Sequence, residues 1–527
     1  MKAERLFRVL GLVDEDLIEE AASPAVCQRK FPLWKTLAAA CLGVICLLSF
    51  SFLLGRMGGS KTGATAPGEA SSNGDGGSGI ATDNEPLSVD GTTFMSYAGP
   101  VFPLTLAEEN GGLTAERTTT WDFAPGTYHD GTPRQWGAGV TDSYTIVNIT
   151  DSEQNMTALY PFTGSFTELA SQQPTVTVDG EEVERTLYAG AYVGGFRDAG
   201  VDDGSTWNLE YPDSWTDYKD LLEDGRYLDA ALGDGPVLDI PVTVYEFTDF
   251  EAPHKEYDAA TQSIEFTIDQ GKTTVLAYGF NGASWDEDTG WRQYSYFVPN
   301  GVRRDKDPKL LVVLGEDITD YALGGYENGG CEKEIDGVSC TVTRREATLD
   351  EVLDVLCRDY LETYADWQYG MTEDETAAVP YALFRRAVGE LMVQYGPMAG
   401  GNTVDRYADG RLDDIISEAM SMDRVLYLAV PVTVPAGGKV NITFALWKEP
   451  SFDFGCSGSE NMGLQGYDFV TRLGSTLAFT GQQAALVNTD GIQIERQNFG
   501  FDLEQGVTEV TLAPETDHYY LEIRPKE

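Results

Sequence analysis

An acidic turn between two tryptophans has the residue types in this chain best suited to ligand binding. The segment SWDEDTGW places Asp286 and Asp288 between Trp285 and Trp291. Carboxylate oxygens in a turn bind hard cations such as Ca²⁺, and tryptophan rings stack on sugars. We therefore name Trp285, Asp286, Asp288 and Trp291 as a candidate binding site. The same pattern is also typical of a solvated hairpin turn with packed aromatic residues, and the sequence leaves both interpretations open.

No familiar catalytic or metal-binding spacing occurs in the sequence. The three histidines, His129, His254 and His518, are scattered and form no H-E-x-x-H pair. The G-x-S-x-G elbow, the S-x-x-K motif and the P-loop are absent as well, and the acidic turns do not match the twelve-residue calcium loop. We expect no metal, no cofactor and no enzymatic activity. A hydrolase that uses an acid pair is an alternative.

Four of the seven cysteines follow the apolar segment described next, namely Cys331, Cys340, Cys357 and Cys456. Cys331 and Cys340 flank an Asp-Gly turn. A two-residue hairpin would separate them by roughly 8 Å, beyond the ~7 Å that a disulfide spans. Another loop register would bring them closer, so their pairing stays open.

An apolar run near the N-terminus predicts a membrane span. Thr36–Leu54 is a run of 19 residues without a charge. As a helix it would extend roughly 28 Å, close to the ~30 Å hydrocarbon core of a bilayer. Arg29, Lys30 and Lys35 precede it, so the positive-inside rule places the N-terminus in the cytoplasm. We predict an uncleaved signal anchor in the cell membrane with the C-terminal bulk extracellular.

The charge of the chain is distributed unevenly. The 527 residues include 36 Lys and Arg and 85 Asp and Glu, for a formal net charge of -49. Residues 1–61 carry 8 basic and 6 acidic side chains, so the acidic excess belongs to the part after the span. Such acidity excludes nucleic acid and anionic lipid headgroups as partners of the bulk. Hydrophobic residues make up 42%, which supports packed cores and excludes wholesale disorder.

Residues 1–35 are predicted to form a cytoplasmic amphipathic segment. Leu6, Leu10, Val13 and Leu17 recur at helical spacing, as in a helix that docks on a partner protein. The alternative is a membrane-proximal helix that only orders the anchor.

The beginning of the chain resembles a known group of proteins. LFRVLGLVDEDLIEEAA, followed by FPLWKTLAAACLGVI, resembles the start of single-pass membrane proteins of Clostridia-type Gram-positive bacteria. GLQGYDFVTRLGS, QNFGFDLEQGV and HYYLEI near the chain end resemble their exterior domains. Some of these proteins are regarded as anti-sigma-factor-like regulators, so the resemblance implies a cytoplasmic regulatory partner such as a sigma factor. The chain lacks the zinc-binding His and Cys pattern of one anti-sigma class, because Cys27 stands alone.

The part after the span has the composition of β-sandwich domains. Residues 55–90 form a flexible Gly/Ser-rich linker. Short runs of β-branched and aromatic residues between turn residues then predict a first β-rich exterior domain over 91–300 and a second over 301–527. A 3.6-residue period at about 347–423 predicts a helical insertion in the second domain. The fold class is mainly β with α insertions.

Two local signals define element ends within this part. Thr348 and Glu351 form a capping-box pattern ahead of the first inserted helix. Asp179-Gly180 is a dipeptide typical of a two-residue hairpin turn.

These observations favour a non-enzymatic, single-pass cell-envelope protein. Its exterior part would sense or bind something, and its cytoplasmic segment would dock a regulatory protein. The alternative is a surface adhesin or carbohydrate-binding module with a passive anchor, whose partner is a surface glycan or protein.

Overall fold

The computed structural model describes residues 98–127, 133–134, 136–171, 173–192, 226–253, 260–286, 288–298, 308–318, 320–404, 407–453 and 463–526. Within these ranges, no helix is long and apolar enough to cross a bilayer. The predicted span Thr36–Leu54, the linker, and the predicted docking residues Leu6, Leu10, Val13 and Leu17 lie outside the described residues.

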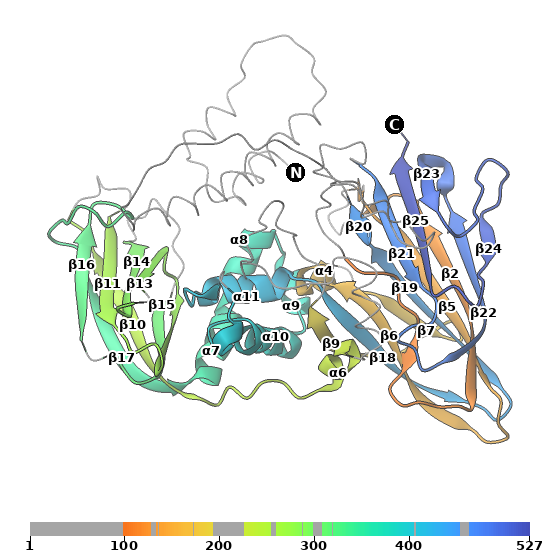
Figure 1. The fold of residues 1–527 in the computed structure, drawn as a ribbon, viewed down its shortest axis with the longest axis horizontal. Helices are drawn as coiled ribbons and strands as arrows, with labels where there is room; N and C mark the ends of the chain where they lie inside the picture. Colours follow the sequence, from red (N-terminus) through yellow and green to blue (C-terminus); the bar gives the residue numbers. More distant parts are fainter. Residues whose placement is uncertain are drawn as a thin grey trace, which may run out of the picture.

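The described chain is mainly β, as the sequence predicts, and its strands form two sandwiches with helices between them (Figure 1). The strands of the first sandwich are β1 (Thr105–Leu106), β2 (Leu113–Asp122), β5 (Ala138–Asn148), β6 (Gln154–Gly164), β7 (Thr175–Val178), β8 (Glu181–Glu182), β9 (Thr186–Tyr192), β18 (Arg424–Val434), β19 (Lys439–Lys448), β20 (Phe452–Asp453), β21 (Gln465–Val470), β22 (Ala478–Val487), β23 (Ile492–Gln497), β24 (Glu509–Thr511) and β25 (His518–Pro525). A two-stranded ribbon, β3 (Gly126–Thr127) and β4 (Pro133–Arg134), lies outside these sheets.

The second sandwich is continuous in sequence and consists of two four-stranded sheets, β12-β15-β10-β17 and β13-β14-β11-β16. Its strands are β10 (Pro241–Glu251), β11 (Thr261–Thr267), β12 (Thr273–Tyr278), β13 (Gly282–Asp286), β14 (Trp291–Phe297), β15 (Lys309–Gly315), β16 (Tyr321–Tyr326) and β17 (Ser339–Thr348).

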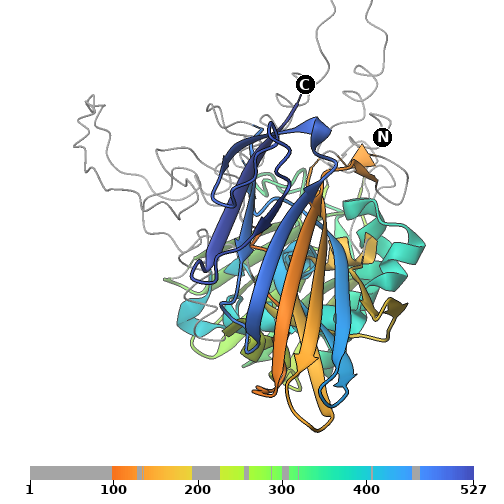
Figure 2. The same ribbon diagram turned by 90° about the vertical axis from the view of Figure 1, so that its right-hand side faces the viewer.

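The first sandwich is assembled from both ends of the described chain. A seven-stranded sheet, β24-β22-β2-β5-β19-β7-β8, packs against two smaller sheets, β1-β6-β18-β9 and β20-β21-β25-β23. β18 pairs with β6 over its whole length, and β2 runs parallel to β22. Figure 2 shows the early strands (orange) and late strands (blue) side by side in the large sheet.

This pairing corrects the domain boundary expected near residue 300. β11 pairs with β14 before that point and with β16 after it, so one sandwich crosses the boundary. Strands of 105–192 pair with one another and also with strands from Arg424 onward, such as β6 with β18 and β5 with β19. The alternation of side chains indicates which face of a strand is buried, but it does not indicate the partner strand. The second sandwich is therefore an insertion in the first.

The helices after β17 occupy the stretch in which the 3.6-residue period occurs. They are α7 (Leu349–Asp359), a π-helical turn (Tyr360–Tyr364), α8 (Ala365–Tyr369), α9 (Glu373–Ala378), α10 (Tyr381–Gln394) and α11 (Leu412–Ser421); α4 (Phe166–Ser171) and α6 (Arg226–Leu232) come earlier in the chain. The capping box predicted at Thr348 and Glu351 is confirmed, with both of its hydrogen bonds present at the start of α7. The Asp179-Gly180 turn is also confirmed, because both residues have positive φ and join β7 to β8.

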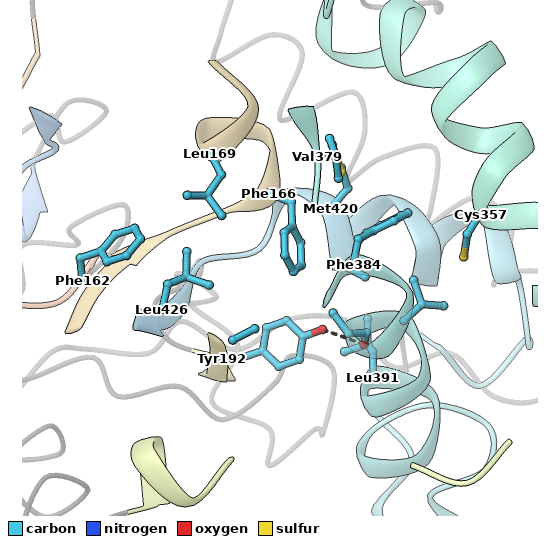
Figure 3. Close-up of a cluster of buried hydrophobic side chains, with 14 of the residues drawn as sticks. Phe162, Phe166, Leu169, Tyr192, Cys357, Val379, Phe384, Leu391, Met420 and Leu426 are labelled. Atoms are coloured by element: carbon cyan, nitrogen blue, oxygen red, sulfur yellow. Dashed lines mark hydrogen bonds between the residues drawn. The ribbon is translucent and has the colours of Figure 1, made fainter. Parts of the chain in front are cut away.

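The helices are packed between the two sandwiches (Figure 1). One buried cluster runs from Leu276 of β12 through Leu353 of α7 and Leu391 of α10 to Leu426 of β18. Figure 3 shows Phe166 and Phe384 in this cluster, where their rings meet edge to face at 6.0 Å. This shared core holds the two sandwiches and the helices together, because burial of apolar surface is the main favourable contribution to folding.

A buried ion pair lies where the two smaller sheets meet above the large sheet. Arg117 and Asp142 are fully buried and joined at 2.8 Å. Arg117 also donates to the carbonyl oxygens of Val470 (2.7 Å) and Phe102 (2.8 Å), and Tyr144 donates to Asp142 at 2.6 Å. The pair thus bridges strands from both ends of the chain.

Candidate functional site

The predicted site at the acidic turn forms the hairpin between β13 and β14. Asp286 pairs with Trp291, and Trp285 pairs with Arg292. Successive side chains of a strand point to opposite faces, so Trp285 and Trp291 lie on opposite faces of the sheet. The structure does not bring the two tryptophans together around one ligand. The Arg292 guanidinium lies 5.9 Å from the Trp285 ring centroid instead.

The carboxylate of Asp286 stabilises the turn itself. It accepts hydrogen bonds from the backbone N–H groups of Asp288 (2.9 Å) and Thr289 (3.3 Å). This is the local arrangement that aspartate commonly makes in turns. Asp288 is exposed beside it. The geometry is that of an acidic hairpin turn, the second of the two interpretations that the sequence leaves open.

The described cysteines are free thiols. Cys331 and Cys340 are each half-buried, and Cys357 is buried within α7. Burial raises the pKa of Cys357 to about 12, so this thiol is inert near neutral pH. The disulfide between Cys331 and Cys340 that the sequence left open is not formed.

A charged pocket lies at one end of the first sandwich, next to the helical layer. It encloses about 570 Å³, part of it open to solvent. Its charged lining residues are Arg134, Glu168, Asp423, Lys448 and Glu449. They come from β4, α4, the connection between α11 and β18, and the end of β19. The first described residue, Ala98, also lines the pocket.

Lys448 forms the buried base of this pocket. It occupies the inward-facing position that follows Val440, Ile442 and Phe444 along β19, and its side chain is 4% exposed. Its ammonium donates to the carbonyl oxygens of Ala98 (3.1 Å) and Glu449 (2.9 Å). Burial lowers the pKa of Lys448 to about 8, although the carboxylates of Asp423 and Glu449 act in the opposite direction.

Glu168 is positioned by the start of α4. Its carboxylate accepts from the Ser165 N–H at 3.1 Å, and the Ser165 hydroxyl accepts from the Glu168 N–H at 3.2 Å. This reciprocal pair is a capping box, although α4 is short. The Glu168 side chain is open to solvent. Partial desolvation of its carboxylate against the pocket lining and then the carboxylate of Asp423 raise the pKa of Glu168.

Asp423 lies where the helical layer rejoins the first sandwich, between α11 and β18. Its side chain is half-buried. Desolvation and the carboxylate of Glu449 raise the pKa of Asp423 to about 7, and the Lys448 ammonium opposes this shift. Like charges in a partly enclosed site disfavour the ionised form. Both Glu168 and Asp423 therefore keep their protons to a higher pH than isolated carboxyl groups do.

One wall of the pocket is formed by Trp447 and Arg134. The Arg134 guanidinium lies 5.5 Å from the Trp447 ring centroid, and the indole N–H donates to the Trp136 carbonyl oxygen at 3.1 Å. A Cβ atom at Gly126 or Gly137 would overlap the Trp447 ring. Glycine at both positions therefore lets the β3–β4 ribbon close over this ring.

Sequence reasoning missed this pocket because its residues have no common local pattern. The one available signal was Lys448 itself, a charged residue at an inward position of an otherwise apolar alternation. A buried lysine is rare unless it is paired, so this position could have been singled out. Glu168 and Asp423 reach the pocket only through the tertiary fold.

Among the residues that the structure describes, no three His, Cys, Asp or Glu side chains are placed to hold a metal ion. The carboxylates of the pocket are thus not arranged as a metal centre. A scan against protein-family models finds no match to the chain, and a search of curated proteins finds none either. The candidate site therefore rests on its own geometry.

Proposed function

We propose that this chain is a non-enzymatic, single-span cell-envelope protein whose acidic exterior part binds a ligand in the charged pocket. The observation that carries the proposal is the contact between Lys448 and Ala98. Ala98 lies eight residues after the predicted linker that joins it to the predicted span, and it is part of the pocket wall. A ligand in the pocket would therefore lie at the point where the chain from the membrane enters the fold.

Asp423, two residues after the end of α11, also lines the pocket and brings the end of the helical layer to it. A ligand there would touch the first sandwich, the end of the helical insertion and the entering chain together. In this proposal the cytoplasmic residues 1–35 dock a regulatory protein, and the exterior part reports on the ligand.

Membrane topology is the first test. In intact Gram-positive cells that express the full chain, a membrane-impermeant maleimide should label a cysteine introduced as Val237→Cys, because Val237 is 81% exposed. Cys27 should be labelled only after permeabilisation, and peptide mass spectrometry locates the label. The parent chain controls for Cys331 and Cys340. Labelling of Cys27 in intact cells, or protection of position 237, would contradict the proposed topology.

The docking role has a separate test. The N-terminal 35 residues serve as bait, and a sigma factor or another single regulatory protein should co-purify. Leu10→Glu should abolish capture because it places a charge on the predicted apolar face, whereas Asp16→Asn should not. Equal capture by both variants would exclude a docking face at Leu6, Leu10, Val13 and Leu17.

The pocket also favours one second candidate, an acid-pair hydrolase. A general acid needs a carboxyl group that stays protonated near neutral pH, and Glu168 and Asp423 both have raised pKa values. Aryl glycosides with chromogenic leaving groups test this between pH 6 and 8. Turnover that disappears in both Glu168→Gln and Asp423→Asn would support the hydrolase, and no turnover in the parent chain would exclude it for these substrates.

A further inference from the structure

A buried segment leads the chain into the first sandwich. Residues 99–106 are buried without interruption, and the exposed residues Glu108 and Glu109 follow them. We call residues 98–106 the entry strap, because they are the first described part of the chain after the predicted linker. Any load that passes from the membrane side of the chain to the exterior part therefore reaches the entry strap first.

The apolar side chains of the entry strap enter three separate buried clusters. Val101 packs in the cluster that contains Phe469, and Phe102 packs in the cluster that contains Tyr227. The rings of Phe102 and Tyr227 lie 6.5 Å apart. Leu104 is part of the large cluster that runs through the helical layer. One short segment thus contributes to the packing of all three clusters, and its withdrawal would disturb each of them.

The entry strap is attached by few bonds of the regular strand ladder. Pro100 and Pro103 have no N–H group to donate. Along β21 the Val101 N–H donates to the Asp468 oxygen (2.8 Å), and the Val470 N–H donates to the Val101 oxygen (3.0 Å). The last two residues of the strap form β1 and pair with β6. β2 is attached far more extensively, because it pairs with β5 and β22 along its whole length.

Side chains from other strands hold the strap in place of a ladder. The Ala98 oxygen accepts from the Lys448 ammonium (3.1 Å) and from the Thr163 hydroxyl (2.5 Å). The Phe102 oxygen accepts from the Arg117 guanidinium at 2.8 Å. Arg117 is fully buried and belongs to the ion pair at the joint of the sheets. Withdrawal of the strap would therefore take one acceptor from a buried charge, which is costly unless water replaces it.

We propose that the entry strap is released by tension, so that load on the membrane side withdraws residues 98–106 while the sheets of the first sandwich stay folded. This proposal rests on the proposed function, because a chain anchored on its N-terminal side loads the strap from that side. Release also removes Ala98 from the wall of the charged pocket and from Lys448. The same movement would thus alter the proposed ligand site and loosen the joint at Arg117.

A pulling experiment with magnetic tweezers tests the release directly. The full chain is held in detergent micelles, with one handle in the linker 55–90 and the other at the chain end. Release of residues 98–106 should come first and add roughly 30 Å of free chain, at about 3.3–3.6 Å per residue. Unfolding of the sandwiches should follow as separate, much longer steps, because local segments open at lower cost than whole cores.

Lys448→Met should make the first step about tenfold faster at a given force, because the charged donor to the Ala98 oxygen is lost. Lys439→Met is the matched control, since it changes an exposed lysine on the same strand and should leave the rate of the first step unchanged. Thr163→Val removes the second donor to the Ala98 oxygen and keeps the shape of the side chain. It should also speed the first step, and it serves where Lys448→Met does not fold.

Hydrogen exchange measured by mass spectrometry tests the coupling without load. The Val101 and Val470 amides both donate between the strap and β21, or to it, so opening of the strap exposes both. Lys448→Met should therefore speed exchange in the peptides that contain Val101 and Val470 by the same factor. Peptides from β10 and β15 in the second sandwich should exchange at the parent rate, because a local opening does not reach them.

A single unfolding step with no earlier release would overturn the proposal. Equal rates of the first step in Lys448→Met and Lys439→Met would also overturn it, as would faster exchange at Val101 with none at Val470. The pulling experiment does not depend on membrane topology. Absence of the first step in a chain with the proposed topology removes only the strap, whereas the opposite topology with the first step present removes the proposed function.

Discussion

The ammonium of Lys448 donates a hydrogen bond of 3.1 Å to the carbonyl oxygen of Ala98, 350 residues earlier in the chain. The Ala98 N–H donates in turn to the Ser451 carbonyl oxygen at 2.6 Å, and the Thr163 hydroxyl donates to the Ala98 oxygen at 2.5 Å. The first described residue is therefore held by the end of β19 and the end of β6. The base of the pocket is therefore hydrogen-bonded to the segment through which the chain enters the fold.

Lys448→Met should loosen this entry point. The substitution keeps the apolar stem but removes the donor for two carbonyl oxygens, so the free energy of unfolding should fall by about 1–3 kcal/mol. Hydrogen exchange at the Ala98 amide should accelerate at the same time. Lys439→Met changes an exposed lysine on the same strand and should alter neither quantity. Unchanged exchange at Ala98 in Lys448→Met would show that the ammonium does not hold the chain.

Asp142→Asn should destabilise the first sandwich strongly. It leaves the fully buried Arg117 charge without its partner, and breaking such a pair costs about 3–5 kcal/mol. Urea unfolding with hydrogen exchange of the β2 and β5 amides measures the loss. Asp517→Asn breaks the exposed Arg472–Asp517 pair and should cost less than about 1 kcal/mol. The double variant Arg117→Met/Asp142→Leu should recover part of the stability, and a deeper loss than Asp142→Asn would contradict this account.

The pocket should make stability depend on pH in two opposite directions. The pKa of Glu168 rises from 4.5 to about 8 and that of Asp423 from 3.8 to about 7, so the folded state retains protons that the unfolded chain releases. Their contribution to the free energy of unfolding therefore falls as the pH rises from about 4 to 8. The pKa of Lys448 is lowered from 10.5 to about 8, so its contribution rises with pH between about 8 and 10.5.

Subtracting the unfolding free energy of the parent from that of a variant at each pH separates the contribution of the mutated group from the effect of the chain's net charge. Asp423→Asn should flatten the decline between pH 5 and 8 in thermal unfolding, and Glu168→Gln should do so less, because water at the pocket mouth screens its charge. Glu504→Gln should follow the parent curve. Parallel curves for Asp423→Asn and the parent would exclude a raised pKa at position 423.

A cysteine pair can test the joining of the two chain ends. Asn155 lies directly opposite Thr433 between β6 and β18, and both side chains are exposed. Directly opposed residues have Cβ atoms about 4.5–5.5 Å apart, close to disulfide geometry. Asn155→Cys/Thr433→Cys should therefore cross-link on oxidation, as mass spectrometry of the digest would show. Asn155→Cys/Pro431→Cys is out of register by two residues and should not cross-link. The opposite pattern would refute this pairing.

Local features of single helices and turns could largely be predicted from the sequence. Thr348 and Glu351 form a capping box because N-terminal N–H groups of a helix need acceptors, whatever surrounds the helix. Asp179 and Gly180 adopt positive φ because the two-residue hairpin turn demands it. The acidic turn at Asp286 could be predicted as a hairpin. Whether Trp285 and Trp291 lie on one face of the sheet depended on the register between β13 and β14. A register that places Arg292 opposite Trp285 puts the two rings on opposite faces.

The sequence by itself therefore determined the strands, the helical stretch and the apolar faces, because short-range sterics and hydrogen bonding act on neighbouring residues. It also placed a lysine at the inward position 448. Only the tertiary structure decided that β6 pairs with β18, that one sandwich is inserted in the other, and that Glu168 and Asp423 meet Lys448. Strand partners are chosen by long-range burial, in which many pairings satisfy the same alternation and the whole core selects one.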